Sequence, residues 1–581
     1  MAFFSMRHDA LTFDELAHIP AGYSYLTQQD YRINPEHPPL AKDIAAFPLI
    51  FLDLNFPANS QNWLQDSGAP PWWVQFDLGN EFLYKSGNNP LSIIFWSRLP
   101  MILLTLALGA VLFFWTRKLL GNGAALAALT LFAFSPSFLA HGRLVTTDVA
   151  AALGILVVAY FWIEFLKQPT KTKVGKAGFA LALAFLFKFG AVLLLPFFAV
   201  ITVIYALLHK ESSGNMRTLG KYVGLSVLVG IVALFLIVPV YQLHIVNYPA
   251  ERQLRDTVSD LQPGGVTAYE QAIIWMADKE PFRAFAQFGR GVLMATQRGQ
   301  FGNTVFFQGE IKVGGFWQYF PLIYFYKVPL AFHVLALFGI LGILWSFQKQ
   351  WYRGIKEMLL TWWIKKHFTF FAFVVFIAGY FLVAMTGNLN IGVRHLLPVF
   401  PLLYILVVWG LKELLSHIEN NQFKRIAVSF VAGLFVWYIG SSLMAFPNYI
   451  PYYNALAGGT ENGYKIAVDS NYDWGQDFYR LLDFVEANNI QKVYLDYFGG
   501  EDPAYWLGNR YAEMRCGDPN RQQTCARAKQ EKGWVAVSAN QLMGGTASPV
   551  TGFDQPTGYY AWLLDFEPTR LGTSIFIYNI K

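Results

Sequence analysis

The sequence is poor in charge. Only 14% of its 581 residues are Asp, Glu, Lys or Arg, whereas a soluble globular protein carries about 25%. Apolar side chains take their place and make up 54% of the chain. Lipid rather than water must therefore surround much of the molecule.

The sequence also lacks the usual signatures of soluble enzymes. It contains no Gly-x-Ser-x-Gly, no Walker loop and no Gly-x-Gly-x-x-Gly, so a nucleotide cradle is not the way in which a substrate is held. No run of basic residues indicates nucleic acid as a partner. The apolar part of residues 1–7 is too short for a cleavable signal peptide or a spanning helix.

Cysteine is nearly absent. The two cysteines, Cys516 and Cys525, lie close together in a polar C-terminal part. They would form one disulfide if that part faces an oxidising compartment, and two free thiols are the alternative of equal weight.

What the sequence does contain is a series of long apolar runs. A spanning helix takes ~20 residues, and we predict a polytopic α-helical membrane protein with about ten such helices. They are expected at residues 91–116, 122–140, 148–166, 177–190, 191–208, 219–241, 321–347, 368–386, 395–411 and 426–446.

Lysine and arginine concentrate in one set of the loops between these runs, which the positive-inside rule places in the cytoplasm. This set comprises Arg117, Lys118, Lys167, Lys171, Lys173, Lys176, Lys210, Arg217, Lys221, Lys349, Arg353, Lys356, Lys365, Lys366, Lys412, Lys424 and Arg425. The short turns of the other face hold Arg143, Lys188 and Arg394.

Basic loops flank both ends of residues 177–208, so an even number of crossings must lie between them. We predict a hairpin that turns near Lys188 and places this lysine on the outer face. The same parity places the N-terminus outside, and we therefore expect that a first spanning helix, an eleventh, is missing from this chain.

The chain divides by composition near residue 446. We predict a transmembrane module over 1–446, in which residues 14–90 form a catalytic outer loop and 242–320 a second large outer loop. Residues 447–581 are expected to form a soluble α/β domain on the same, non-cytoplasmic side. Its strands are predicted at 466–469, 493–496, 534–538 and 574–578, around a helix at 476–487.

The first outer loop gathers acids, imidazoles and cations: Asp14, Glu15, His18, Arg32, Glu36 and His37. Asp14 and Glu15 are neighbours and would point in different directions, so only one can be the reacting group. One would act as a general base and the other would position or polarise. The alternative is that both acids begin a helix, where they complement its dipole. Residues 51–89 are expected to be an irregular, aromatic segment at the membrane interface.

A metal site is the other chemistry that this loop suggests. Glu15 and His18 are three residues apart and would share one helical face, a plausible chelating pair for a divalent metal. No third ligand follows at the spacing of a His-Glu-x-x-His motif. No cofactor is therefore predicted firmly, and a divalent metal stays an open alternative.

Cations stand at the mouths of helices around this acidic loop. Arg143 lies near His141 and precedes Asp148, Lys188 lies in the predicted hairpin, and Arg394 is followed by His395. A departing phosphate requires such a ring of positive charge. Snorkelling to lipid headgroups would explain Lys188 equally well and the two arginines less well.

Several motifs together resemble a known family. They are Asp14-Glu15-x-x-His18, Gly22-Tyr23-x-Tyr25, Glu36-His37-Pro38-Pro39-Leu40-x-Lys42, Gly142-Arg143 through Asp148, Asn390-x-Gly392-x-Arg394-His395 and Asp469 through Asp477. From about residue 9 to its end, the chain resembles the polyprenyl-phosphate-dependent glycosyltransferases of the protein O-mannosyltransferase type, glycosyltransferase family 39 with the GT-C fold, in their bacterial form.

The resemblance implies inverting transfer of mannose or a similar sugar from a polyprenyl phosphate to a hydroxyl of a protein, glycolipid or cell-wall polymer, at the outer face of the cell membrane. The family's catalytic aspartate falls on Asp14, with Glu15 beside it, and its donor-phosphate arginine on Arg143. Lys188 and Arg394 are further candidates for the phosphate. We assign His18, Arg32, His37, Asp148 and His395 to substrate binding. A transporter or flippase of polyprenyl-linked lipids is the alternative, although the matched broken helices of such proteins are not evident.

Overall fold

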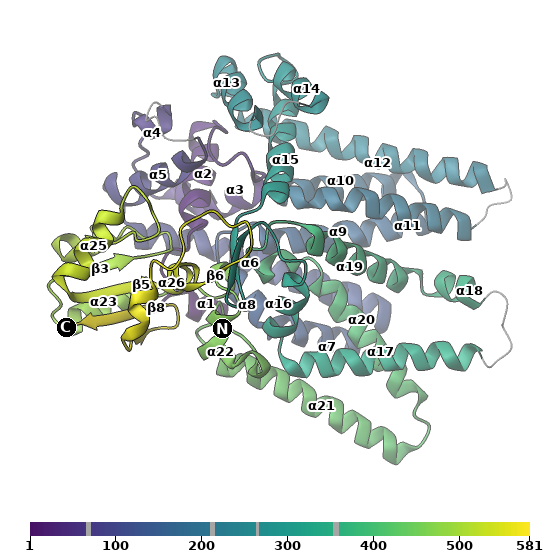
Figure 1. Cartoon of the computed structure of the whole chain (residues 1–581). Coiled ribbons are helices and arrows are strands. Elements are labelled where there is room, and N and C mark those ends of the chain that lie inside the picture. The colour runs from purple at the N-terminus through teal and green to yellow at the C-terminus, as the bar shows by residue number, and fades with distance from the viewer. Residues whose placement is uncertain (66–70, 210–214, 263–266, 352–358) are drawn as a thin grey trace.

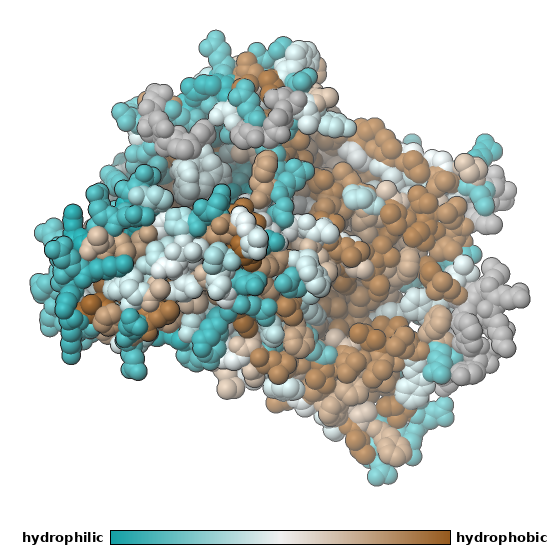
Figure 2. Space-filling view, viewed as in Figure 1, coloured by the Kyte–Doolittle hydropathy of each residue, from teal (hydrophilic) through white to brown (hydrophobic). Residues whose placement is uncertain are grey.

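The computed structural model describes residues 1–65, 71–209, 215–262, 267–351 and 359–581. A bundle of long helices forms one side of the molecule, and shorter helices and two sheets form a head on the other side (Figure 1). Apolar side chains cover the visible face of the bundle, whereas polar ones cover the head (Figure 2). This division is what a bilayer around the bundle and water around the head require.

Among the described residues, eight helical segments are long and apolar enough to cross a membrane. They are α6 (Pro90–Leu120), α9 (Asp148–Lys167), η3 with α11 (Phe189–Leu208), α12 (Asn215–His244), α17 (Leu330–Trp351), α19 (Phe368–Thr386), α20 (Phe400–His417) and α21 (Asn421–Met444). The predicted polytopic helical fold is confirmed. The remaining two predicted spans are the shorter helices α7 (Asn122–Ala133) and α10 (Lys171–Phe187).

The predicted hairpin between residues 177 and 208 is confirmed. Helix α10 ends at Phe187, Lys188 takes an extended conformation, and the 3-10 turn η3 (Phe189–Leu193) leads into α11 (Leu194–Leu208). The predicted span 321–347 is instead two helices, α16 (Tyr319–Lys327) and α17, because Pro329 stands between them. Of the basic loop residues, Lys210, Arg353 and Lys356 lie outside the described part of the chain.

Close helix packing depends on small residues. Helices α17 and α20 pack along each other, and a Cβ added at Gly410 would lie 2.1 Å from the Gly339 carbonyl oxygen. Glycine at this crossing lets the two backbones approach, which is how helices associate where lipid removes the hydrophobic driving force.

The head contains more helix than the sequence predicts. Residues 51–89, expected to be irregular, include α4 (Gln61–Leu64), α5 (Pro71–Asn80) and the π-helical turn η2 (Glu81–Lys85). The prediction was wrong because the aromatic residues of α5 pack inward as well as facing out, and Val74 and Leu78 are buried. The other helices of this region are α1 (Ala2–Met6), α2 (Glu15–Gln28), α3 (Leu40–Ala46), α8 (Pro136–His141), α13 (Ala250–Leu261), α14 (Ala268–Met276) and α15 (Arg283–Phe301).

The C-terminal part holds a five-stranded sheet of order β4-β3-β5-β8-β7. Its strands are β3 (Val493–Asp496), β4 (Tyr511–Glu513), β5 (Gly533–Ser538), β7 (Thr569–Leu571) and β8 (Ile575–Ile580). Strands β4 and β5 pair with β3 in parallel, and β8 pairs antiparallel with β5 and β7. Helices α23 (Phe478–Ala487), α24 (Pro503–Leu507), α25 (Gln522–Glu531) and α26 (Ala539–Thr546) accompany the sheet.

Three of the four predicted strands are confirmed. The fourth, 466–469, is not a strand: Ile466 N–H donates to the Gly463 carbonyl in a turn, and Asp469 takes a left-handed conformation with φ 56°, which ends an extended run. Beyond this segment, a second small sheet joins β1 (Thr304–Phe307), β2 (Glu310–Val313) and β6 (Ser548–Pro549). It pairs the predicted loop 242–320 with residues 447–581, and the division at residue 446 stays a prediction.

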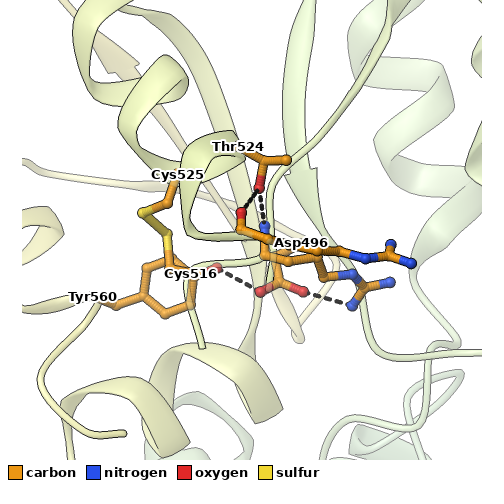
Figure 3. Close-up of a disulfide and its surroundings, with 7 residues drawn as sticks. Asp496, Cys516, Thr524, Cys525 and Tyr560 are labelled. Atoms are coloured by element: carbon orange, nitrogen blue, oxygen red, sulfur yellow. Dashed lines mark hydrogen bonds and ion pairs between the residues drawn. A yellow bond between two sulfur atoms is a disulfide. The ribbon is translucent and has the colours of Figure 1, made fainter. Parts of the chain in front are cut away.

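The two cysteines form a disulfide at one edge of the five-stranded sheet (Figure 3). Beside it, the Asp496 carboxylate at the end of β3 accepts hydrogen bonds from Arg515 Nη1 at 2.8 Å and from the Tyr560 hydroxyl at 2.5 Å. The Thr524 hydroxyl accepts from the Arg515 backbone N–H at 2.9 Å. The disulfide therefore closes a short loop against a buried carboxylate.

Residues before Asp14 are tied to the C-terminal part. The backbone N–H of Ala10 donates to the Gln476 carbonyl at 3.0 Å, and that of Phe13 donates to the Trp474 carbonyl at 3.2 Å. The Gly500 N–H donates to the Leu11 carbonyl at 3.0 Å. These bonds hold the start of α2 between the bundle and the C-terminal sheet.

Candidate active site

A cavity of about 760 Å³ lies where the head meets the helical bundle. Its wall combines residues of α5, η3, α15, α19 and η5 (Val393–Leu396) with the start of α2 and the segment around Asp469. Its acidic, basic and histidine lining residues are Asp14, His18, Glu36, His37, Lys188, Arg298, Arg394, His395 and Asp469. Acids and cations from distant parts of the chain thus face one space.

Asp14 stands at the N-cap of α2, with Glu15 as the first helical residue. Its carboxylate accepts a hydrogen bond from Arg394 Nη1 at 2.6 Å, and its side chain is 22% exposed. Burial alone would raise the pKa of Asp14, but the Arg394 guanidinium outweighs burial and the pKa lies below its usual value. Asp14 is therefore an ionised carboxylate with access to the cavity.

Asp148 bridges the two cations beside Asp14. Its Oδ1 pairs with Lys188 Nζ, and its Oδ2 lies 3.6 Å from Arg394 Nη1. Asp148 is the first residue of α9 and is 1% exposed, so it lies behind the cations rather than in the cavity wall. Its role is to hold Lys188 and Arg394 side by side.

The Arg394 guanidinium keeps unused hydrogen-bonding capacity. Its carbon lies 4.3 Å from the centroid of the Trp474 ring, which fixes its plane. Among the described residues, its buried Nε has no hydrogen-bond partner. A free guanidinium edge next to a cavity is suited to bind an anion such as phosphate.

The histidines of the cavity are neutral at pH 7. The His18 ring lies 5.0 Å from the His37 ring, and His18 Nδ1 lies 2.9 Å from the Val145 carbonyl oxygen. Burial lowers the pKa of His18, and burial lowers those of His37 and His395 further. These imidazoles can accept or donate a hydrogen bond, but they do not supply charge.

Glu36, Arg298 and Trp72 form a second charged corner. Trp72 Nε1 donates to Glu36 Oε1 at 3.1 Å, and Arg298 lies 3.9 Å from Glu36 Oε2 and 4.9 Å from the centre of the Trp72 ring.

The predicted site residues did not include three residues of the cavity wall, Arg298, Trp72 and Asp469. Asp469 belongs to a motif that the sequence displays, whereas Arg298 has no local signal, because only the packing of α15 brings it to the cavity.

Four predicted site residues do not line the cavity: Asp148, which lies behind the cations, and Glu15, Arg143 and Arg32. Glu15 is fully buried and binds Arg98 at 2.6 Å, Arg143 is 1% exposed and pairs with Asp9, and Arg32 pairs with Asp30. In each case a nearby partner of opposite charge turns the side chain away. The structure thus brings together Asp14, His18, His37, Lys188, Arg394 and His395, with Asp148 directly behind them.

The predicted metal-chelating pair, Glu15 and His18, binds other protein groups instead. Glu15 accepts hydrogen bonds from Arg98 and from the Val145 and Thr12 backbone N–H groups, and His18 contacts the Val145 carbonyl. Within the described ranges, no group of three or more His, Cys, Asp or Glu side chains is arranged to hold a metal ion.

Residues 91–241 match the sequence model of the dolichyl-phosphate-mannose-protein mannosyltransferase family. This segment carries Arg143, Asp148 and Lys188. Over this segment, which holds the motif from Gly142 to Asp148, the match confirms the predicted resemblance and the predicted class of enzyme, a glycosyltransferase. No curated protein matches the chain.

The solved structures with a similar overall trace include the following two. ArnT from Cupriavidus metallidurans bound to undecaprenyl phosphate is 12% identical, with a TM-score of 0.44 over 99% of this chain and 95% of that one. The apo oligosaccharyltransferase of Archaeoglobus fulgidus is 11% identical, with a TM-score of 0.46 over 96% of this chain and 69% of that one.

Proposed function

Since residues 91–241 match the dolichyl-phosphate-mannose-protein mannosyltransferase family, we propose that this enzyme transfers mannose or a similar sugar from a polyprenyl phosphate to a hydroxyl group. The acceptor belongs to a protein, a glycolipid or a cell-wall polymer. One observation carries the proposal: an ionised, accessible carboxylate, Asp14, faces the same cavity as Lys188 and Arg394.

The reaction is a single displacement with inversion at the sugar. Asp14 takes the proton of the acceptor hydroxyl while the acceptor oxygen bonds to the anomeric carbon. The bond from that carbon to the phosphate oxygen breaks, and the electron pair leaves with the phosphate. A positioned base typically contributes ~10²–10⁴-fold, and Lys188 and Arg394 stabilise the charge of the leaving group.

Arg394 links donor binding to the activation of the base. In the structure its Nη1 binds Asp14 at 2.6 Å and holds the pKa of that carboxylate down. A phosphate that draws the guanidinium to itself weakens this hold, and Asp14 then binds a proton more strongly. The base is therefore strongest when the donor is in place.

The two ends of the cavity favour a lipid-linked donor. Its wall on the bundle side is apolar and comes from spanning helices, whereas the charged residues lie at the head. The apolar wall includes Ala151, Ile155, Val192, Leu193, Val383 and Ala384. A polyprenyl chain fits such a wall, and its phosphate would then reach the cations.

The outer face of the cell membrane is the proposed location of the cavity. Lys118 and Lys173 both pair with Glu164 near the end of α9, whereas Asp148 begins that helix at the cavity. The basic loops therefore lie at the opposite end of the bundle, which the positive-inside rule places in the cytoplasm. A disulfide in the C-terminal part supports the same orientation, since disulfides persist in oxidising compartments.

The test uses purified protein in liposomes with a labelled polyprenyl-phospho-sugar. We expect free polyprenyl phosphate to appear faster when a hydroxyl acceptor is present. The control variant Asp53→Asn changes an exposed carboxylate of the same outer region and should behave like the wild type. Movement of intact donor across the bilayer without release of polyprenyl phosphate would instead identify a flippase. Mass spectrometry of envelope glycoconjugates from cells with and without the protein then identifies the acceptor.

A further inference from the structure

Asp469 has an unusual backbone at the wall of the cavity. Its φ is 56°, and it is one of seven non-glycine residues with positive φ in the described part of the chain. Of these, only Asp469 and Asn34 line the cavity. Such a conformation is unfavourable for a residue with a side chain and persists where surrounding contacts impose it, often at functional sites.

The contacts around Asp469 fix it next to Arg394. Its N–H donates to Asn540 Oδ1 at 3.2 Å. The following Ser470 hydroxyl donates to the Ile391 carbonyl, and Asn471 Oδ1 accepts from the Val393 N–H at 2.9 Å. Ser470 and Asn471 therefore hold in place the segment that carries Arg394.

A buried lysine reinforces this arrangement from behind. Lys327 Nζ donates to the carbonyls of Asn471 and Ile450, each at 2.7 Å, and is 3% exposed. Asn471 Nδ2 also donates to the Tyr319 hydroxyl at 2.7 Å. The position of Asp469 is therefore imposed by α16, η5 and α26 together.

Asp469 and Asp14 experience the same guanidinium differently. Burial raises the pKa of Asp469 to about 6, because the attraction of Arg394 does not offset it and the Asp14 charge adds to it. Further groups near Asp469 include the Ser470 N–H and the Tyr319 phenol, and Asp148 is a further like charge near Asp14. Asp14, bonded to Arg394, has a lowered pKa. Two carboxylates with divergent proton affinities in one cavity indicate a division of roles.

We propose that Asp469 is a positioning residue of the transfer reaction, a further carboxylate of the cavity wall that strengthens Asp14 as a base. It acts by like-charge repulsion, since a negative charge nearby favours the protonated form of Asp14. The C-terminal part thereby contributes a residue to the reaction centre. This inference rests on the proposed function and assigns that part a role in the chemistry.

The sign of the pH dependence follows. When the pH falls through about 6, Asp469 takes up a proton and loses its charge. Asp14 then becomes a weaker base, and kcat falls. The pH profile of the wild-type kcat should therefore show an acid limb, a fall in kcat as the pH decreases, near pH 6. In Asp469→Asn the limb should move to lower pH, and kcat at pH 7.5 should fall about tenfold with the donor KM not raised.

The experiment measures kcat and donor KM from pH 5 to 8 for the wild type, Asp469→Asn and Asp469→Glu in liposomes. Asp469→Glu should restore part of kcat and the limb. The control is Asp477→Asn, which removes a buried carboxylate of the same motif that binds Thr573 and Ser574 at 2.8–2.9 Å instead of facing the cavity. It should lower the Tm and leave the limb in place.

An acid limb of Asp469→Asn at the wild-type pH would overturn the inference, whether or not the Tm of that variant falls as that of Asp477→Asn does. A wild-type protein that releases no polyprenyl phosphate at any pH would refute the proposed function itself, and the role of Asp469 would fall with it.

Discussion

Two groups of buried ion pairs, built from neighbouring parts of the sequence, differ in what surrounds them. The cavity cluster consists of Asp14, Asp148, Lys188 and Arg394. The N-terminal cluster consists of Asp9, Glu15, Arg98 and Arg143. In the cavity cluster, Asp14 and Lys188 are 22% and 19% exposed, whereas no member of the N-terminal cluster exceeds 4%.

Hydrogen bonding further separates Arg98 of the N-terminal cluster from Arg394 of the cavity cluster. All three nitrogens of Arg98 donate, to both Glu15 oxygens and to the carbonyls of Met6, Asp9 and Ala10. The Arg394 Nη1 binds Asp14, and its buried Nε has no partner among the described residues. The buried Nε of Arg143 has no partner there either, but Arg143 does not line the cavity. A saturated ion pair fixes the chain, whereas one with spare donors beside a cavity can bind a ligand.

The largest effect is expected from breaking the N-terminal cluster. Glu15→Gln leaves the buried Arg98 charge without its counterion, and we expect the free energy of unfolding to fall by about 3–5 kcal/mol. Asp14→Asn, one residue away, should change it by less than about 1 kcal/mol, because Asp14 is partly exposed. Thermal unfolding in detergent compares the two variants. Equal losses of stability would contradict the distinction between the clusters.

A smaller effect, on donor binding, should separate the cations. A hydrogen bond to a charged group is worth about 1.5–3 kcal/mol, so Arg394→Gln and Lys188→Met should each raise the dissociation constant of the donor about 10- to 150-fold. Arg143→Gln should leave this constant unchanged in the folded protein, because Arg143 is paired with Asp9 outside the cavity lining. Equilibrium binding of a labelled polyprenyl phosphate tests all three. If Arg143→Gln bound polyprenyl phosphate weakly, Arg143 rather than the cavity cations would be the residue that binds the donor phosphate.

The smallest expected effect is a loss of folding stability at acid pH. Burial lowers the pKa values of His18 and His37 in the folded state, so the unfolded chain binds protons first as the pH falls below ~6.5. Each buried imidazole then lowers the free energy of unfolding by up to about 1.4 kcal/mol per pH unit. Glu15 keeps its charge, since Arg98 outweighs burial and lowers its pKa. Hydrogen exchange at pH 5.5 should therefore show residues 34–42 opening before residues 6–15, and the reverse order would contradict this view.

The sequence predicts the helices and the acidic loop but not the division between the clusters. Asp14 and Glu15 both stand at the start of α2, as the helical alternative requires. Which of them faces the cavity depends on Arg98, 83 residues after Glu15. No local pattern encodes that contact.

Prediction from the sequence is limited in the same way for the basic residues of the site. Lys188 was predicted to lie in an outer turn because basic loops flank its hairpin, and the structure places it in a turn between α10 and α11. Arg143 and Arg394 have similar sequence surroundings, but Asp9 captures Arg143 and Trp474 stacks on Arg394. Both partners come from distant segments, so only the folded chain distinguishes the two arginines.

The most direct test of the catalytic centre is the rate at which Asp14→Asn releases polyprenyl phosphate from a labelled donor in the presence of acceptor. We expect a fall of at least about 10²-fold, with donor affinity and unfolding temperature close to those of the wild type. An Asp14→Asn variant that turns over at the wild-type rate would show that this carboxylate does not take the proton.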